Sequence, residues 1–183
     1  MPYNSDQTSL HFNYIEAVKL GQLDVVKDFI NNQGIDANKQ YVSKSTLHIA
    51  IEHGHLDIVR YFTEECNVNV NTKGSRHGPS AFTAAWNHRR FDILRYFAKE
   101  CPAKIEYIST DARAILLNSA ENGDLESVQF FVGEGIVDVN VAGRDQQTAL
   151  HRAVYNDRNN IVEWLIHQGH AKLDVPAISP SLL

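Results

Sequence analysis

The sequence predicts an all-α protein built as a linear stack of about five helix-turn-helix repeats. Three observations lead to this prediction. A small residue recurs every 33 to 35 positions, each segment carries two short apolar stripes of helical period, and Asn- and Asp-rich turns separate the segments. Self-similarity at a fixed period of this length is typical of a solenoid, in which each repeat contacts only its neighbours.

The recurring small residue defines a common frame for the five segments. It is found at Ala17, Ala50, Ala85, Ser119 and Ala153, and the successive spacings are 33, 35, 34 and 34 residues. A second marker lies eight residues further on in every segment, at Val25, Ile58, Ile93, Ser127 and Ile161. We therefore expect one domain over 1–183, with repeats at approximately 10–42, 43–77, 78–111, 112–145 and 146–178.

Each segment is predicted to form two short helices. Leu47, Ala50 and Ile51 follow i, i+3, i+4 spacing and mark one face of a first helix, which ends at Gly54. Leu56 opens a second apolar stripe. Helices this short are not stable alone in water, so each repeat must bury its apolar face against its neighbours.

The segments between repeats are predicted to form turns, which we call fingers. The segments 34–38, 67–71 and 136–140 are rich in Asn and Asp, which tolerate left-handed backbone and bond their own main chain. The finger over 72–79 is longer than its siblings and contains Gly74 and Gly78. Its extra length fits either a binding element or a solvated loop insertion.

The repeat resembles the ankyrin repeat. Residues 45–50 read Ser-Thr-Leu-His-Ile-Ala and residues 148–153 read Thr-Ala-Leu-His-Arg-Ala, similar to the T-P-L-H-x-A signature of that family. The resemblance covers roughly residues 10–175. Both copies lack the proline, and Arg89 and Asp157 replace the glycine that follows the first helix. The resemblance implies an ankyrin-repeat solenoid with short β-hairpin-like fingers, which binds a protein in its concave groove and is not an enzyme.

Nine histidines and two cysteines invite a search for a metal or catalytic site. The resemblance implies that His48 and His151 bond the turn backbone. No H-E-x-x-H, C-x-x-C, G-x-S-x-G or phosphate-binding glycine loop is present, so we predict no metal, cofactor or catalytic residue. Cys66 and Cys101 occupy equivalent repeat positions about one repeat thickness apart, which predicts reduced, unpaired thiols.

Composition narrows the class of partner. The formal net charge of -5 argues against a nucleic-acid partner, and no apolar run approaches the ~20 residues that span a bilayer. The first residues show no secretory signal. We expect a cytoplasmic monomer, with the nucleus, or delivery into a host cell, as alternatives.

Two features of the middle repeats leave alternatives open. Residues 72–104 carry a net charge of +5 and residues 105–140 a net charge of -6. This asymmetry fits either pairing between adjacent repeats or a bipolar surface that steers a charged partner. Trp86 stands where the other repeats have smaller residues, and it fits either a repacked core or the rim of the groove.

Side chains outside the apolar periodicity are the candidates for partner binding. They fall at the ends of the first helices and on the fingers, chiefly on the concave face of repeats two to four: Tyr41, Glu52, His53, Lys73, Arg76, His77, Asn87, His88, Tyr107, Glu121, Asn122, Arg144, Tyr155 and Asn156. The sequence predicts a protein-binding scaffold or adaptor. The alternatives are a module of a larger signalling protein or pathogen effector and, more remotely, an enzyme or small-molecule receptor.

Overall fold

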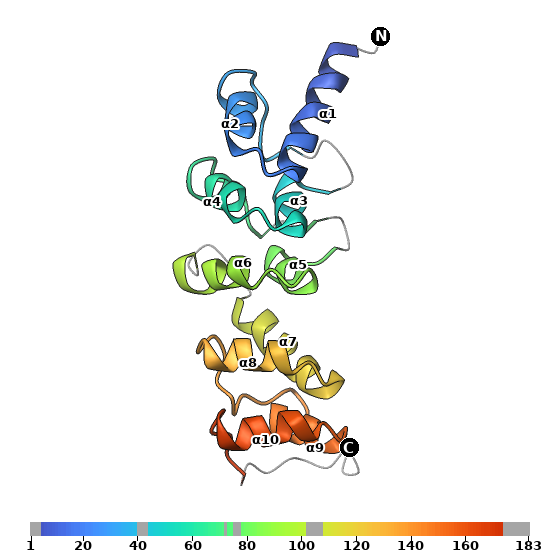
Figure 1. Cartoon of the computed structure of the whole chain (residues 1–183), viewed down its shortest axis with the longest axis vertical. Helices are drawn as coiled ribbons and strands as arrows, with labels where there is room; N and C mark the ends of the chain where they lie inside the picture. The colour runs from blue at the N-terminus through green and yellow to red at the C-terminus, as the bar shows by residue number, and fades with distance from the viewer. Residues whose placement is uncertain (1–4, 40–43, 72, 75–77, 102–107, 174–183) are drawn as a thin grey trace. The chain divides into compact units, whose positions relative to one another are not determined.

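The computed structural model describes residues 5–39, 44–71, 73–74, 78–101 and 108–173, which form pairs of helices joined by turns (Figure 1). The chain divides into two compact units, Met1–Glu106 and Tyr107–Leu183, and each is described by itself. The predicted all-α fold of paired helices is confirmed. Within the described residues, the one β-bridge pairs Ala142 with Thr148 in a finger of the second unit.

The described residues of the first unit form three helix pairs. They are α1 (Ser5–Lys19) with α2 (Leu23–Asn31), α3 (Thr46–His53) with α4 (Leu56–Glu64), and α5 (Ala81–Asn87) with α6 (Phe91–Arg95), which continues into a π-helical turn, η1 (Tyr96–Glu100). Helix α3 packs between α1 and α5, and α4 contacts both α2 and α6. The unit therefore has an inner column of α1, α3 and α5 and an outer column of α2, α4 and α6 (Figure 1).

In the second unit, the part of the chain that the structure describes forms two helix pairs with the same arrangement. They are α7 (Ile108–Asn122) with α8 (Leu125–Gly133) and α9 (Ala149–Tyr155) with α10 (Asn159–His167). The inner helices α7 and α9 pack together, and so do the outer helices α8 and α10.

A hydroxyl at one frame position decides where an inner helix begins. Ser45, Ser80 and Thr148 are the N-caps of α3, α5 and α9, and each side-chain oxygen accepts a hydrogen bond from the backbone N–H three residues on. Phe12 and Ala114 occupy this position in the first and fourth repeats, and neither can cap a helix. The helices there, α1 and α7, start further upstream and are 15 residues long.

The turn between the two helices of a repeat requires left-handed backbone. Gly21, Gly54 and Gly123 have φ of 71°, 81° and 86°, which confirms the predicted break. Arg89 and Asp157 hold the same position in the third and fifth repeats, and both have φ of 56°. The turn geometry is therefore retained where the glycine is missing, at some cost in backbone strain.

A side chain just after this turn bonds back to the preceding repeat. His55 Nε2 lies 2.8 Å from the Lys19 carbonyl, Arg90 Nη2 donates to the Glu52 carbonyl at 2.7 Å, and Arg158 Nε donates to the Glu121 carbonyl at 2.9 Å. Each acceptor lies in the last turn of an inner helix, where carbonyls have no partner within the helix. The three contacts tie successive repeats together within each unit.

The predicted apolar register is confirmed. Leu47, Ala50 and Ile51 on α3 have no exposed surface, and Val59 and Phe62 on α4 are equally buried. These side chains fill the space between consecutive helix pairs, which is how short helices obtain stability in a stack.

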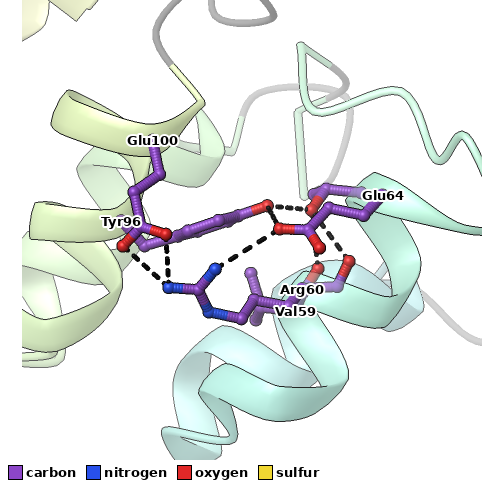
Figure 2. Close-up of polar contacts among 6 residues, drawn as sticks. Val59, Arg60, Glu64, Tyr96 and Glu100 are labelled. Atoms are coloured by element: carbon purple, nitrogen blue, oxygen red, sulfur yellow. Dashed lines mark hydrogen bonds and ion pairs between the residues drawn. The ribbon is translucent and has the colours of Figure 1, made fainter.

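A polar network joins the outer helices of the second and third repeats (Figure 2). The Arg60 guanidinium lies 4.4 Å from the ring centre of Tyr96 and reaches both Glu100 carboxylate oxygens at 2.7 Å. The Tyr96 hydroxyl contacts the buried Thr63 hydroxyl and lies 3.0 Å from Glu64 Oε1. Burial raises the pKa of Tyr96, so the phenol stays protonated and can donate to one of these oxygens. The network fixes η1 against α4.

Candidate partner-binding site

In the first unit, the predicted binding residues lie at the ends of the inner helices. Glu52 and His53 are the last two residues of α3, Asn87 ends α5, and His88 follows it as the C-cap. Lys73 lies on the finger between α4 and α5. Glu52 is half-buried, and the other four side chains are exposed. The His53 ring stacks on the His55 ring, with the ring centroids 6.3 Å apart, but all four side chains keep exposed surface that a partner can reach.

In the second unit, the predicted residues occupy the equivalent positions. Glu121 and Asn122 end α7, Tyr155 ends α9, and Arg144 lies on the intervening finger. Tyr155 is 83% exposed, which is unusual for an aromatic side chain. Asn156 is half-buried, and its side chain donates to the Arg152 carbonyl, so it closes the end of α9.

Four predicted residues, Tyr41, Arg76, His77 and Tyr107, lie outside the described residues.

A pocket of about 450 Å³ opens between α3 and α5 in the first unit. It is lined by Lys44, His48, Glu52, Gly74, Pro79, Ala84 and His88. Two of the predicted residues, Glu52 and His88, form part of its wall. The volume of this pocket falls within the ~300–1,000 Å³ range of ligand sites.

An ion pair sets the charge of the pocket. Lys44 Nζ lies 2.7 Å from Glu52 Oε2, and this hydrogen bond lowers the pKa of the Glu52 carboxyl. His88 and His53 lie close enough to lower it further by their charge. Glu52 is therefore a carboxylate over the physiological pH range. Lys44 itself is 51% exposed, so its ammonium stays hydrated while it pairs.

His48 forms the rigid wall of the pocket. Its Nε2 lies 3.1 Å from the Pro79 carbonyl, which can only accept, so Nε2 carries the proton. In the neutral ring Nδ1 then accepts from the Ser45 hydroxyl at 2.8 Å. Burial lowers the pKa of His48, which favours this neutral form. His48 thus bonds the finger backbone, as the resemblance implied.

Sequence reasoning missed several residues that shape the pocket. Lys44, Gly74, Pro79 and Ala84 were not among the predicted binding residues, although they line it. A Cβ built on Gly74 would come within 2.7 Å of the His48 ring, so this glycine keeps the finger close to α3. The available signal was a comparison within the frame, because Ala84 stands where the fifth repeat has Arg152.

The second unit fills the corresponding place with its own side chain. Arg152 Nη1 lies 2.8 Å from Glu121 Oε2, and Nη2 lies 3.1 Å from Asp145 Oδ2. The Arg152 side chain is only 19% exposed. Glu121 is thus neutralised by an arginine of this chain, whereas Glu52 faces a pocket and an exposed lysine.

The described residues offer no cluster for metal chemistry. No group of three or more His, Cys, Asp or Glu among them is placed to hold a metal ion. Cys101 is buried and Cys66 half-buried, and both are free, which confirms the prediction of unpaired cysteines. Burial raises the pKa of the Cys66 thiol, so it is a poor nucleophile at neutral pH. None of the helices described here is long and apolar enough to cross a membrane.

The helix pairs, the left-handed turns and the finger-bonded histidine define an ankyrin-repeat array. The family model "Ankyrin repeats (3 copies)" matches residues 14–111 and 83–176, so the chain belongs to the ankyrin-repeat family. Ankyrin repeats generally mediate protein–protein interaction.

Three relatives show how far the similarity extends. The 26S proteasome non-ATPase regulatory subunit 10 of Dictyostelium discoideum is 37% identical over 59 residues, 32% of this chain and 25% of that protein. Palmitoyltransferase AKR1 of Debaryomyces hansenii is 39% identical over 59 residues, 32% of this chain and 7% of that protein. Alpha-latrotoxin-Lg1a of Latrodectus geometricus is 31% identical over 165 residues, 90% of this chain and 11% of that protein. The chain matches a quarter or less of each relative.

Proposed function

We propose that this chain is a non-catalytic adaptor that binds a protein partner on the inner-helix side of its repeats. The observation that carries the proposal is the set of exposed polar and aromatic side chains at the inner-helix ends, beside the pocket between α3 and α5. These side chains sit on helices whose opposite faces are fully buried, so they are held in place before a partner arrives. Preorganisation of this kind reduces the entropy lost on binding.

The same proposal extends to the exposed side chains of the second unit. Tyr155, Asn122 and Arg144 combine an aromatic surface with hydrogen-bonding and charged groups, the composition of a protein-binding surface. The finger residues Arg76 and His77 and the turn residues Tyr41 and Tyr107 remain part of the proposal by their places in the repeat frame.

We further propose that the array acts as one module of a larger assembly or a longer protein. Each of the three similarities covers a quarter or less of the relative, and the names of the three relatives indicate different functions. A reduced compartment, such as the cytoplasm or nucleus, suits the two free thiols. A catalytic role has no supporting arrangement among the described residues.

Site-specific photo-crosslinking tests the binding surface directly. A photoreactive amino acid is placed at His88 beside the pocket and, as a matched control, at the exposed Lys99 on the outer η1 turn. Each variant is irradiated in cell lysate, and the products are compared by mass spectrometry. The proposal requires one protein to crosslink from His88 and not from Lys99. Crosslinking from Lys99 alone would move the binding surface to the outer helices.

A further inference from the structure

The position just before the frame alanine holds a small residue in the third repeat and a long, charged one in the fifth. Ala84 and Arg152 each come immediately before the frame alanine of their repeat, Ala85 and Ala153. Arg152 extends its guanidinium to Glu121 and Asp145. Ala84 has no side chain beyond Cβ, and the space beside it belongs to the 450 Å³ pocket that Glu52 also lines.

The surroundings of the two places otherwise correspond. Glu52 and Glu121 both lie two residues after the frame residue, and the backbone carbonyl of each accepts from an arginine of the next repeat. Gly74 and Gly143 both stand three residues after the turn asparagine of their finger. A Cβ on Gly143 would come 2.6 Å from Asp145 Oδ1 and 3.3 Å from Arg152 Nη2, so this glycine leaves room for the ion pair.

The carboxylate in the first unit has only a weakly held partner. Lys44 reaches Glu52 through a single contact of 2.7 Å and is half exposed, so the ammonium can return to water at little cost. A guanidinium presents a planar pair of N–H donors that matches a carboxylate better than an ammonium does. The nearby Arg90 does not prevent this, because Arg158 occupies the same place beside the Arg152 ion pair.

We propose that the pocket between α3 and α5 receives an arginine side chain of the partner, whose guanidinium replaces Lys44 on Glu52. The occupant takes the place that Arg152 takes in the second unit, with its methylene groups against Ala84 and the His48 ring. This inference rests on the proposed function, because it names the group that a protein partner inserts. Among the described residues that line the pocket, Glu52 is the one carboxylate, and the positive charge of Lys44 opposes the entry of the arginine. An isolated arginine peptide should therefore bind weakly, and a partner supplies the remaining affinity elsewhere.

Peptide titration followed by NMR tests the proposal without knowledge of the partner. The ¹⁵N-labelled full chain is titrated with the blocked pentapeptide Gly-Gly-Arg-Gly-Gly and with matched peptides that carry citrulline, Lys or Glu at the centre. Citrulline has the shape of arginine without its charge. We expect saturable shifts at the amides of Glu52, Ala84 and His88 with the arginine peptide, weaker shifts with lysine, and none with citrulline or glutamate.

Substitutions at Glu52 and Ala84 distinguish binding of the arginine side chain in the pocket from nonspecific electrostatic attraction of the peptide. Glu52→Gln should weaken arginine-peptide binding about tenfold or more, because the charge-assisted pair is lost. Ala84→Arg should abolish it, since the new side chain fills the pocket, whereas Ala84→Ser should leave it intact. The same spectra report whether each variant is folded.

Removing the arginine of the second unit should create a second binding site for the arginine peptide. Arg152→Ala exposes Glu121 and Asp145, and the arginine peptide should then also shift their amides. Amide shifts from the citrulline or glutamate peptide equal to those from the arginine peptide would overturn the proposed arginine pocket. Unchanged binding of the arginine peptide by Ala84→Arg would overturn it as well. Crosslinking from His88 that persists alongside such a result would leave the proposed adaptor function standing while removing this inference.

Discussion

The α3–α5 junction of the first unit and the α7–α9 junction of the second are built on the same frame but finish differently. Both place a glutamate at the end of the inner helix and tie its carbonyl to an arginine of the next repeat. In the second unit Arg152 completes the junction by pairing with two carboxylates, whereas in the first unit Ala84 leaves a pocket. A repeat array can therefore make a pocket by omitting a side chain from a position that is filled elsewhere.

The signature histidines show a related difference. His48 joins Ser45 of its own repeat to the Pro79 carbonyl of the next finger, whereas the Nδ1 of His151 accepts from the backbone N–H and hydroxyl of Thr148. The first contact holds two repeats together, and the second completes a capping box within one repeat.

The largest expected effect comes from the buried leucines that share a frame position in the two units. Leu47 is fully buried and Leu150 is 9% exposed. We expect Leu47→Ala to lower the free energy of unfolding by about 2–5 kcal/mol. Leu150→Ala should lower it by less, because the cavity left by removing the Leu150 side chain lies nearer solvent. Urea denaturation of both variants measures the difference. An equal or larger loss at Leu150 would show that the two positions are not packed as described.

The next effect concerns two buried hydroxyls with unlike surroundings. Thr63 Oγ1 lies 3.0 Å from the Val59 carbonyl and also contacts the Tyr96 hydroxyl, whereas Ser119 Oγ has no hydrogen-bond partner among the described residues. Thr63→Val should cost about 1–3 kcal/mol, and Ser119→Ala should stabilise the chain by up to about 1 kcal/mol. Thermal denaturation of the two variants should give shifts of opposite sign. A loss of stability in Ser119→Ala would mean that this hydroxyl has a partner.

A smaller effect is expected from opening the second junction. Arg152→Ala leaves Glu121 and Asp145 without their shared cation and should lower stability by about 1 kcal/mol, less at high salt. The matched control is the exposed Arg144, which lies next to Asp145 on the finger before α9, and Arg144→Ala should leave stability unchanged. The free energy of unfolding in low and high salt measures both. Equal losses in the two variants would assign the effect to net charge alone.

The pH dependence of stability should reflect the buried histidine of the first unit. Burial holds the pKa of His48 in the folded chain below its ordinary value of 6.5. The unfolded chain therefore binds more protons below that pH, so stability should fall as the pH decreases through 6.5. His48→Gln should flatten this slope. A slope of the same size in the variant would place the titrating group elsewhere.

The fold could be predicted from the sequence because its determinants repeat. Five copies of one frame, with Leu47, Ala50 and Ile51 on a single helical face, leave little freedom in how the helices pack. The greater lengths of α1 and α7 could also be predicted from the sequence, because Phe12 and Ala114 stand where the other inner helices have a capping hydroxyl. The apolar register and the helix caps are readily predicted because they depend on residues close in sequence and recur in each repeat.

The pocket could be predicted only in part. Glu52 and His88 were expected at the surface because they fall outside the apolar period, and both line the pocket. Ala84 gave no signal of its own, because a pocket is made by atoms that are missing. Lys44 precedes α3 and contacts Glu52, which lies eight residues further along the chain. Such contacts are set by three-dimensional placement, which the period alone does not specify.

A double-mutant cycle between Ala84→Arg and Glu52→Gln tests most directly whether the pocket is the vacant counterpart of the Arg152 seat. The cycle compares the effect of Ala84→Arg on the free energy of unfolding when Glu52 is intact and when it has been replaced, so the steric cost of the new side chain cancels. We predict a favourable coupling of about 0.2–1 kcal/mol, the range for a partly exposed ion pair. A coupling of zero, or one of the opposite sign, would contradict the equivalence of the two junctions.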